Sequence, residues 1–177
     1  MNEYDKINNE LNKIKLLYRI NDGTCMSFLV TDNPKYQEYI KQKILSIDTN
    51  TIKDENIVAY DLFDNAQEGF DKFKETFKTK GNLVIVTGVQ KYSEYLKEQG
   101  ILANTEDFYM GYFNMPRDGL YLANKARLIF IVNQSEYDMF LSENADDFTS
   151  YASLKIDIDK MLKQDKYRNK QLEDEER

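Results

Sequence analysis

Histidine is absent from all 177 residues, and tryptophan is absent as well. Without an imidazole the chain cannot form a Ser–His–Asp triad, a Cys–His dyad or a histidine metal site. Any acid–base chemistry must therefore use Asp, Glu, Lys or Tyr side chains. The single cysteine, Cys25, has no partner for an internal disulfide, and its apolar neighbours predict a small buried residue.

Long apolar runs and a basic surplus are also missing. No run approaches the roughly 18 residues of a membrane span, and no signal peptide precedes the first predicted helix, so we expect a cytoplasmic protein with no membrane contact. The 24 Lys and Arg against 31 Asp and Glu give a net charge of -7, which argues against general nucleic-acid binding. The length predicts one compact core.

What the chain does contain is a regular alternation of apolar strands and helices. This pattern is typical of βαβ units with right-handed crossovers, and it predicts an α/β fold with a mainly parallel sheet and helices on both faces. Ligands in such sheets bind beyond the carboxyl ends of the strands. The expected strands cover residues 25–31, 57–63, 83–89, 128–133 and 153–158. The expected helices cover residues 1–20, 34–47, 105–115, 117–124, 135–143 and 159–177, with two more around Phe70 and Tyr92.

The turn after the first strand lacks every feature of a phosphate-binding loop. Such a loop reads GxxxxGK[ST], because glycine N–H groups close around phosphate, the lysine reaches the outer phosphates and the hydroxyl holds magnesium. Residues 31–36 contain no glycine, and Asp32 stands where an anion would bind. Tyr36 follows Lys35 where Ser or Thr is required. The sequence thus predicts a nucleotidase-like layout without its phosphate chemistry.

The first helix has an apolar edge with alternating spacings of three and four. This seam predicts one adhesive face, and two heptads are marginal alone, so the face needs a surface to bind. Two interpretations stay open: the helix docks on its own domain, or it forms a short coiled coil with a partner. The candidate interface residues are Tyr4, Ile7, Leu11, Ile14 and Tyr18.

The aromatic residues also allow two interpretations, packing in the core or contact with a partner. Phe70, Phe73 and Phe77 lie at helical spacing and predict a core-facing stripe. The tyrosines between residues 92 and 121 either pack helices onto the sheet or form a surface for a protein partner, since a tyrosine ring buries area while its hydroxyl stays hydrogen-bonded.

Two further stretches carry a family resemblance. One runs through residues 114–120, 127–133, 140–141 and 144–151, and the other is residues 84–90. Together they resemble the P-loop NTPase-like modules, related to STAND and AAA-type ATPases, of bacterial multidomain proteins with tetratricopeptide repeats. Several proteins of that group serve signalling or antiviral defence. The resemblance covers residues 11–158, with Asp146 in place of a proline and Thr149 in place of a tryptophan.

The resemblance implies a three-layer sandwich whose five-stranded sheet has the order 5-1-4-3-2. It divides the chain into an amphipathic helix (residues 1–20), a degenerate P-loop NTPase-like domain (21–158) and a charged helix or tail (159–177). The resemblance also implies that the chain lacks the catalytic acids of the group. The strand at residues 84–87 ends in Thr87-Gly88 where a magnesium-holding acid belongs, and Gln90 stands where an acid would activate water. We therefore expect no catalytic residues, no metal and no cofactor.

The remaining polar residues are candidates for binding. Asn133 follows the fourth strand, where AAA-type enzymes often place a sensor residue, or it caps the following helix. Arg117-Asp118 match a pair of the group, or they form ion pairs that hold the neighbouring loop. Asp61 lacks the converging acids of a nuclease, and Asp146-Asp147 fit a solvated turn. The candidate binding set is Thr31, Asn33, Lys35, Thr87, Arg117, Asp118 and Asn133. The leading hypothesis is a catalytically inactive module that binds protein partners or itself; the alternative is a nucleotide or small-molecule sensor that does not hydrolyse its ligand.

Overall fold

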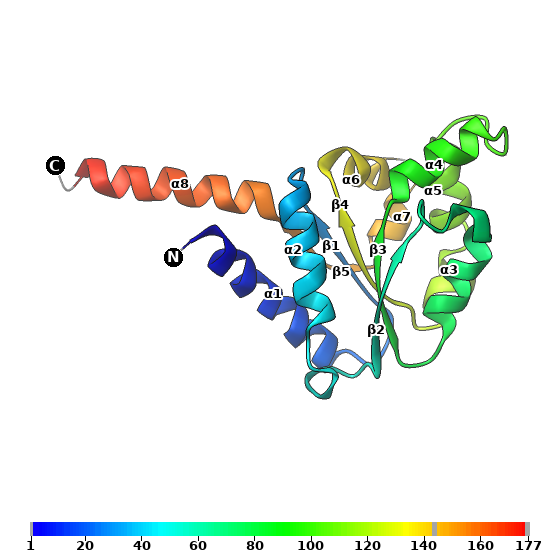
Figure 1. Ribbon diagram of the computed structural model, residues 1–177, viewed down its shortest axis with the longest axis horizontal. Helices are drawn as coiled ribbons and strands as arrows, with labels where there is room; N and C mark the ends of the chain where they lie inside the picture. Colours follow the sequence, from blue (N-terminus) through cyan, green and yellow to red (C-terminus); the bar gives the residue numbers. More distant parts are fainter. Residues whose placement is uncertain (1, 143–144, 176–177) are drawn as a thin grey trace.

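Five parallel strands form the centre of the molecule. The computed structural model describes residues 2–142 and 145–175, with side chains described up to residue 167. The sheet order is β2-β3-β4-β1-β5, and every neighbouring pair is parallel, which confirms the predicted α/β sandwich and its strand order (Figure 1). The strands are β1 (Cys25–Val30), β2 (Asn56–Asp61), β3 (Asn82–Thr87), β4 (Arg127–Val132) and β5 (Ala152–Asp157). Each begins within one residue of its predicted start.

Helices cover both faces of this sheet (Figure 1). The long helices are α1 (Glu3–Ile20), α2 (Pro34–Leu45), α3 (Gly69–Lys78), α4 (Val89–Glu98), α6 (Gln134–Leu141) and α8 (Ile158–Glu175). Shorter segments are η1 (Thr49–Thr51), η2 (Ala66–Glu68), α5 (Glu106–Tyr109) and α7 (Asp146–Thr149). No described helix has the length and apolar character that crossing a membrane requires. The predicted helix end at Glu143, the family-like Asn144 and the last two residues of the predicted tail lie outside the described residues.

Alternating side chains of the strands feed two separate cores. On β1, Met26, Phe28 and Val30 join an aromatic cluster with α3 to α7, whereas Cys25 and Leu29 join an aliphatic cluster with α1, α2 and α8. All six residues of β1 are buried, because a central strand in a parallel sheet is covered on both faces. The predicted phenylalanine stripe of α3 belongs to the aromatic core.

The seam of α1 packs against its own sheet. Ile7, Leu11, Ile14 and Tyr18 are at most 3% exposed and lie in the aliphatic core. The Tyr18 hydroxyl donates to the backbone carbonyl of Leu128 at 2.5 Å, which fixes the end of α1 to β4. This corrects the assignment of these four residues to a partner interface, because their side chains are buried against the sheet. Of the candidate interface residues only Tyr4, at 41% exposed, lies on the surface.

The segment between α5 and β4 differs from the predicted pair of α-helices. It forms two π-helical segments, η3 (Met110–Asn114) and η4 (Arg117–Leu122), with i→i−5 bonds such as Met115 N–H to Met110 C=O at 2.8 Å. Pro116 separates them because it has no N–H to continue the first. The widened turns are local backbone geometry, which residue spacing alone does not reveal.

Candidate functional site

The carboxyl ends of the strands meet at one edge of the sheet. Asp61 and Thr87 end β2 and β3, while Thr31 and Asn133 follow β1 and β4. This edge is where open parallel sheets bind their ligands. The predicted residues Thr31, Asn33, Thr87 and Asn133 therefore do share one edge, and the contacts of each decide what the edge can bind.

The turn after β1 is closed by a carboxylate from the far end of the chain. Asp159, in the first turn of α8, accepts a hydrogen bond from the Thr31 hydroxyl at 2.7 Å and another from the Asp32 backbone N–H at 2.7 Å. Asp32 in turn accepts the Gln134 backbone N–H at 2.8 Å. In a phosphate loop the backbone N–H groups of this turn face the nucleotide. Here the protein's own groups already accept them: Asp159 accepts the N–H of Asp32, and the Thr31 hydroxyl accepts the N–H of Asn33 at 3.2 Å.

Two predicted residues at this turn serve the following helix and the outer surface. The Asn33 side chain caps α2 by accepting the Lys35 backbone N–H at 3.0 Å. The Lys35 side chain is exposed and borders a surface hollow with Tyr4 and Tyr39, not the edge of the sheet. The structure therefore does not bring this candidate binding residue to the edge of the sheet, because the first turn of α2 rotates it away from the strand ends.

Thr87 and Asp61 bind each other across β3 and β2. The Thr87 hydroxyl donates to Asp61 Oδ2 at 2.7 Å, and the Asp64 backbone N–H donates to Asp61 Oδ1 at 2.9 Å. Gly88 follows with φ of 72°, and a Cβ built on it would lie 2.3 Å from Asp61 Oδ1. Only glycine tolerates both the left-handed backbone and this approach. Thr87 and Asp61 thus form a structural contact between the ends of β3 and β2.

A hollow of about 480 Å³ lies between β2, β3 and the start of α6. Thr87 and Asn133 line it, whereas Thr31 and Asn33 do not. Its ionisable side chains are Asp61, Asp64, Lys91, Glu94 and Glu136. Four acids against one lysine make the hollow negative, which opposes the binding of phosphate groups.

Glu136 is the buried acid of this hollow. It is 7% exposed and accepts backbone N–H bonds from Asn133 at 2.8 Å and Gln90 at 3.1 Å. The Asn133 side chain accepts the Glu136 backbone N–H at 2.7 Å, so the pair forms a capping box on α6. Burial raises the pKa of Glu136 despite the two N–H donors. The predicted helix starts at residue 135, and Glu136 was not singled out from the sequence, although the Asn-x-x-Glu spacing contained the signal of a capping box.

Arg117 and Asp118 do not line the edge hollow. Arg117 Nη1 donates to the Asn114 carbonyl at 2.9 Å and pairs with Asp147 at 3.6 Å, while the Tyr151 hydroxyl donates to Asp118 at 3.1 Å. These contacts join η3 and η4 to the segment that leads into β5. The two residues hold neighbouring loops together, which is the structural alternative to a binding role, and the structure does not bring these two candidate binding residues to the edge hollow.

Among the described residues, no group of three or more His, Cys, Asp or Glu side chains is arranged to hold a metal ion. Comparisons of the chain with protein-family models, with curated proteins and with solved structures returned no match.

Proposed function

We propose that the chain is a catalytically inactive NTPase-fold module that acts through protein–protein contacts as an interaction or regulatory subunit. The observation that carries this proposal is the closure of the β1–α2 turn by Asp159, which takes the Thr31 hydroxyl and the Asp32 N–H. A nucleotide phosphate would have to displace this carboxylate and overcome its charge. A bacterial signalling or defence setting follows from the resemblance in residues 84–90 and 114–151.

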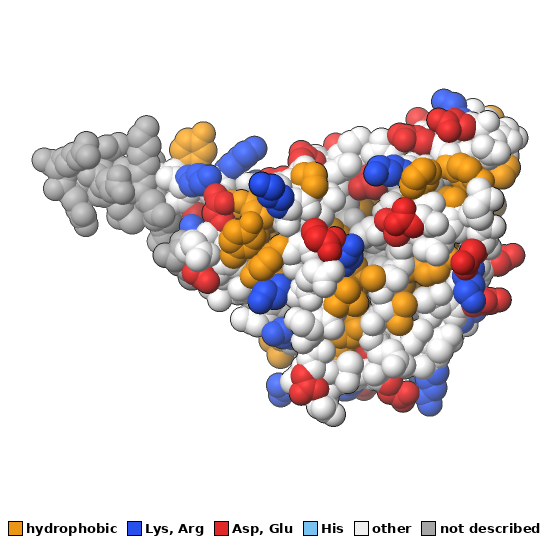
Figure 2. Space-filling view, viewed as in Figure 1, with side chains coloured by type: hydrophobic (Ala, Val, Ile, Leu, Met, Phe, Trp, Pro, Cys, Tyr) orange, Lys and Arg blue, Asp and Glu red, His pale blue; other side chains and the backbone are white. Residues whose placement is uncertain are grey.

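An exposed apolar patch offers a surface for the partner. It consists of Tyr4, Pro34 and Tyr39 with the stems of Lys35, Glu38 and Gln42. The Tyr4 and Tyr39 rings are in edge contact at 4.7 Å, so the patch is preformed. Figure 2 shows hydrophobic side chains gathered where the first turns of α1 approach α2. Tyrosine is enriched at interface centres because its ring buries a large area at small entropic cost.

Isothermal titration with magnesium-ATP and magnesium-GTP tests the loss of nucleotide binding. We expect no heat up to millimolar nucleotide and no ATP turnover. Binding tighter than about 100 μM, or about -5.5 kcal/mol, would contradict the proposal. Turnover that disappears in Lys35→Ala or Asp61→Ala would overturn it.

Affinity capture of a partner tests the proposed interaction role of the Tyr4–Tyr39 patch. Affinity capture from the source organism's lysate is compared between the wild-type chain and a Tyr4→Ser/Tyr39→Ser variant, with Tyr167→Ser as the matched control because Tyr167 is exposed on α8, outside the patch. A protein that the wild type and the control retain and the double variant loses supports the patch. Equal capture by the wild type, the control and the double variant contradicts a role of the patch in partner binding.

The second candidate function is a sensor that binds without hydrolysis. The edge hollow of about 480 Å³ favours it, because the hollow opens at the ligand-binding end of the sheet and offers Thr87 and Asn133. Its negative walls favour a cationic small molecule over a nucleotide. A thermal-shift series with nucleotides and with polyamines separates the two, since a ligand of the native state raises the melting temperature by mass action.

A further inference from the structure

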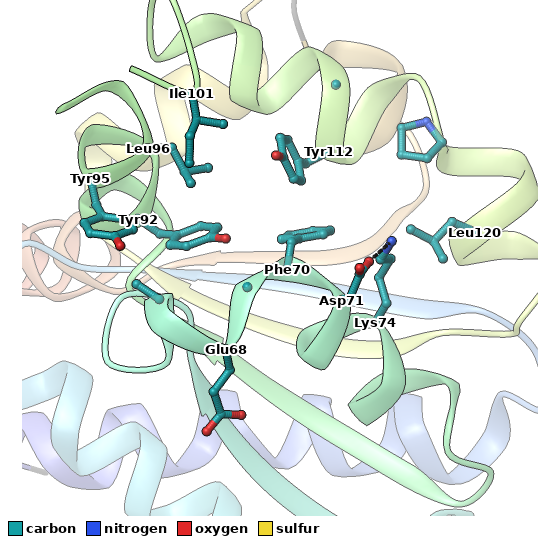
Figure 3. Close-up of a pocket in the computed structure, with 14 residues that line it drawn as sticks. Glu68, Phe70, Asp71, Lys74, Tyr92, Tyr95, Leu96, Ile101, Tyr112 and Leu120 are labelled. Atoms are coloured by element: carbon teal, nitrogen blue, oxygen red, sulfur yellow. Dashed lines mark ion pairs between the residues drawn. The ribbon is translucent and has the colours of Figure 1, made fainter. Parts of the chain in front are cut away.

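A second hollow lies on the other side of α4 from the edge site. It has a volume of about 520 Å³ and shares no lining residue with the edge hollow. Figure 3 shows that α3, α4 and the segment of η3 and η4 enclose it, with side chains pointing inward from each. Its aromatic and aliphatic lining residues are Phe70, Tyr92, Tyr95, Leu96, Tyr112 and Leu120, and polar atoms make up nearly as much of its surface as apolar ones. A concave site that combines aromatic walls with convergent polar groups is the usual form of a small-molecule pocket.

One polar group inside this aromatic pocket lacks a protein partner. No hydrogen bond joins the Tyr92 hydroxyl to a described residue, although the residue as a whole is only 2% exposed. Figure 3 shows this hydroxyl directed into the hollow, toward Phe70. Its oxygen is not one of the enclosed, unpartnered atoms, which among the described residues are the hydroxyls of Tyr60 and Tyr109, so it opens onto the hollow. The Tyr92 hydroxyl is therefore available as a donor to a molecule in the pocket.

The wall opposite α3 is built from the two π-helical segments. Gly111 of η3 and Pro116 and Leu120 of η3–η4 line the pocket. A Cβ built on Gly111 would meet nothing within 4 Å, so the glycine leaves open space on the wall. Two π-helical segments in succession are rare, and such segments occur mostly at functional sites. Phe70 and Tyr112 are in edge contact with ring centroids 4.7 Å apart, so together they form one continuous aromatic side of the pocket.

The charged residues around the pocket limit the class of ligand that it can bind. Lys74 forms an ion pair with Asp71, and both lie at the rim, while Glu68 points away from the hollow in Figure 3. No unpaired cation among the lining residues is left to hold an anion. The chain's net charge of -7 opposes anions further. Aromatic walls favour flat ring systems that stack or meet them edge-on.

We propose that this aromatic pocket binds a neutral, planar aromatic or heteroaromatic small molecule that accepts a hydrogen bond from the Tyr92 hydroxyl. The site is separate from the edge of the sheet and from the Tyr4–Tyr39 patch, so it operates whether or not the module binds a protein partner there.

The test uses three probes of similar size with the full chain. Quinolin-2-one is neutral and carries an acceptor, naphthalene has no acceptor, and 2-naphthoate is an anion. Saturation-transfer NMR with each probe up to about 1 mM measures binding. We expect quinolin-2-one to bind most tightly, naphthalene more weakly and 2-naphthoate not at all. The absence of transfer to every probe, or the tightest binding by 2-naphthoate, overturns the proposal.

Two variants assign the binding to this pocket. Tyr92→Phe removes only the hydroxyl and should weaken quinolin-2-one about five- to tenfold while leaving naphthalene unchanged. Gly111→Leu fills the hollow and should abolish binding of both. Gly119→Leu is the matched control, since Gly119 lies in η4 with equal free space but outside the pocket lining, and it should bind like the wild type. Undiminished binding by Gly111→Leu, or loss of binding in Gly119→Leu alone, contradicts the assignment; circular dichroism verifies that each variant is folded.

Discussion

Arg127 donates two hydrogen bonds to the carboxylate of Asp54, one from Nε and one from Nη2, the latter at 2.8 Å. The Asp54 side chain is fully buried, and Arg127 is 11% exposed. The same guanidinium donates to the backbone carbonyls of Tyr18 at 2.6 Å and Asn21 at 2.7 Å. One side chain at the start of β4 thus joins the end of α1 to the loop before β2. Bidentate geometry of this kind is specific to arginine.

Replacement of one member of this buried pair should destabilise the fold strongly. Arg127→Met leaves the Asp54 charge buried and unpaired, which costs about 3–5 kcal/mol in the free energy of unfolding. Urea denaturation followed by circular dichroism measures this. The double variant Arg127→Met/Asp54→Leu should recover part of the loss, because it removes both charges. Lys41→Met, which breaks an exposed pair with Glu38, serves as the control and should cost at most about 0.5 kcal/mol.

The seam of α1 should contribute to the stability of the isolated chain. Leu11→Ala removes a side chain that is 3% exposed and leaves a cavity in the aliphatic core, for an expected loss of about 2–5 kcal/mol. Leu16→Ala, on the same helix at 56% exposed, should change the free energy of unfolding by less than about 0.5 kcal/mol. Chemical denaturation of the two variants gives the comparison. Similar small effects would mean that the seam awaits a partner after all.

Alanine substitutions at two glycines with the same backbone conformation distinguish the cost of backbone strain from the cost of a steric clash. Gly88 has φ of 72° and faces Asp61 at 2.3 Å from a built Cβ, whereas Gly100 has φ of 71° and meets nothing within 4 Å. Gly100→Ala should cost about 1 kcal/mol from the left-handed backbone alone. Gly88→Ala should cost clearly more, since the strand ends must also move apart. Equal melting temperatures for the two variants would show that Asp61 yields without cost.

Glu136 should make stability depend on pH. Its pKa in the folded protein is raised above the ordinary value of 4.5 by burial. A raised carboxyl pKa means that the folded state binds the proton more tightly than the unfolded state. The stabilising contribution is fully present below about pH 4.5 and is lost as the pH rises through the folded-state pKa.

Glu136→Gln removes this titration and keeps an acceptor for one of the two backbone N–H groups, which donate to different oxygens of the carboxylate; the loss of the other bond is a cost that does not depend on pH. Relative to the wild type, the variant should therefore gain stability as the pH rises from about 4 to about 8, across the range in which carboxyl groups titrate. Parallel urea titrations at each pH give the difference in the free energy of unfolding. A difference that stays constant with pH would contradict the raised pKa of Glu136.

The fold followed from the sequence because the strands alternate with helices at clear intervals. Val84 and Val86 on one face of β3, with Leu83 and Ile85 on the other, mark a strand covered on both sides. The π-helical segments did not follow, since their i→i−5 bonds leave no mark in residue spacing. The strand order came from the resemblance in residues 84–90 and 114–151, not from the apolar pattern.

The site was only partly predictable. Thr87 and Asn133 reach the sheet edge because they end or follow strands, which the sequence reveals. The role of Asp159 was not predictable, because its contact with Thr31 spans 128 residues and depends on where α8 begins. Lys35 and Arg117, the candidate binding residues away from this edge, could not be positioned from the sequence, because their orientation depends on the rotation of α2 and on the geometry of η4.

The position of β1 in the sheet has a consequence for synthesis of the chain. Its neighbours are β4 and β5, which begin at Arg127 and Ala152, so this strand is made first and paired last. At the usual 5–20 residues per second, about 5–20 s pass before β4 follows β1 off the ribosome. During that interval Cys25, Met26, Phe28, Leu29 and Val30 have no sheet to cover them. The nascent chain thus presents a six-residue apolar strand throughout most of its translation, which makes it a natural client for ribosome-associated chaperones.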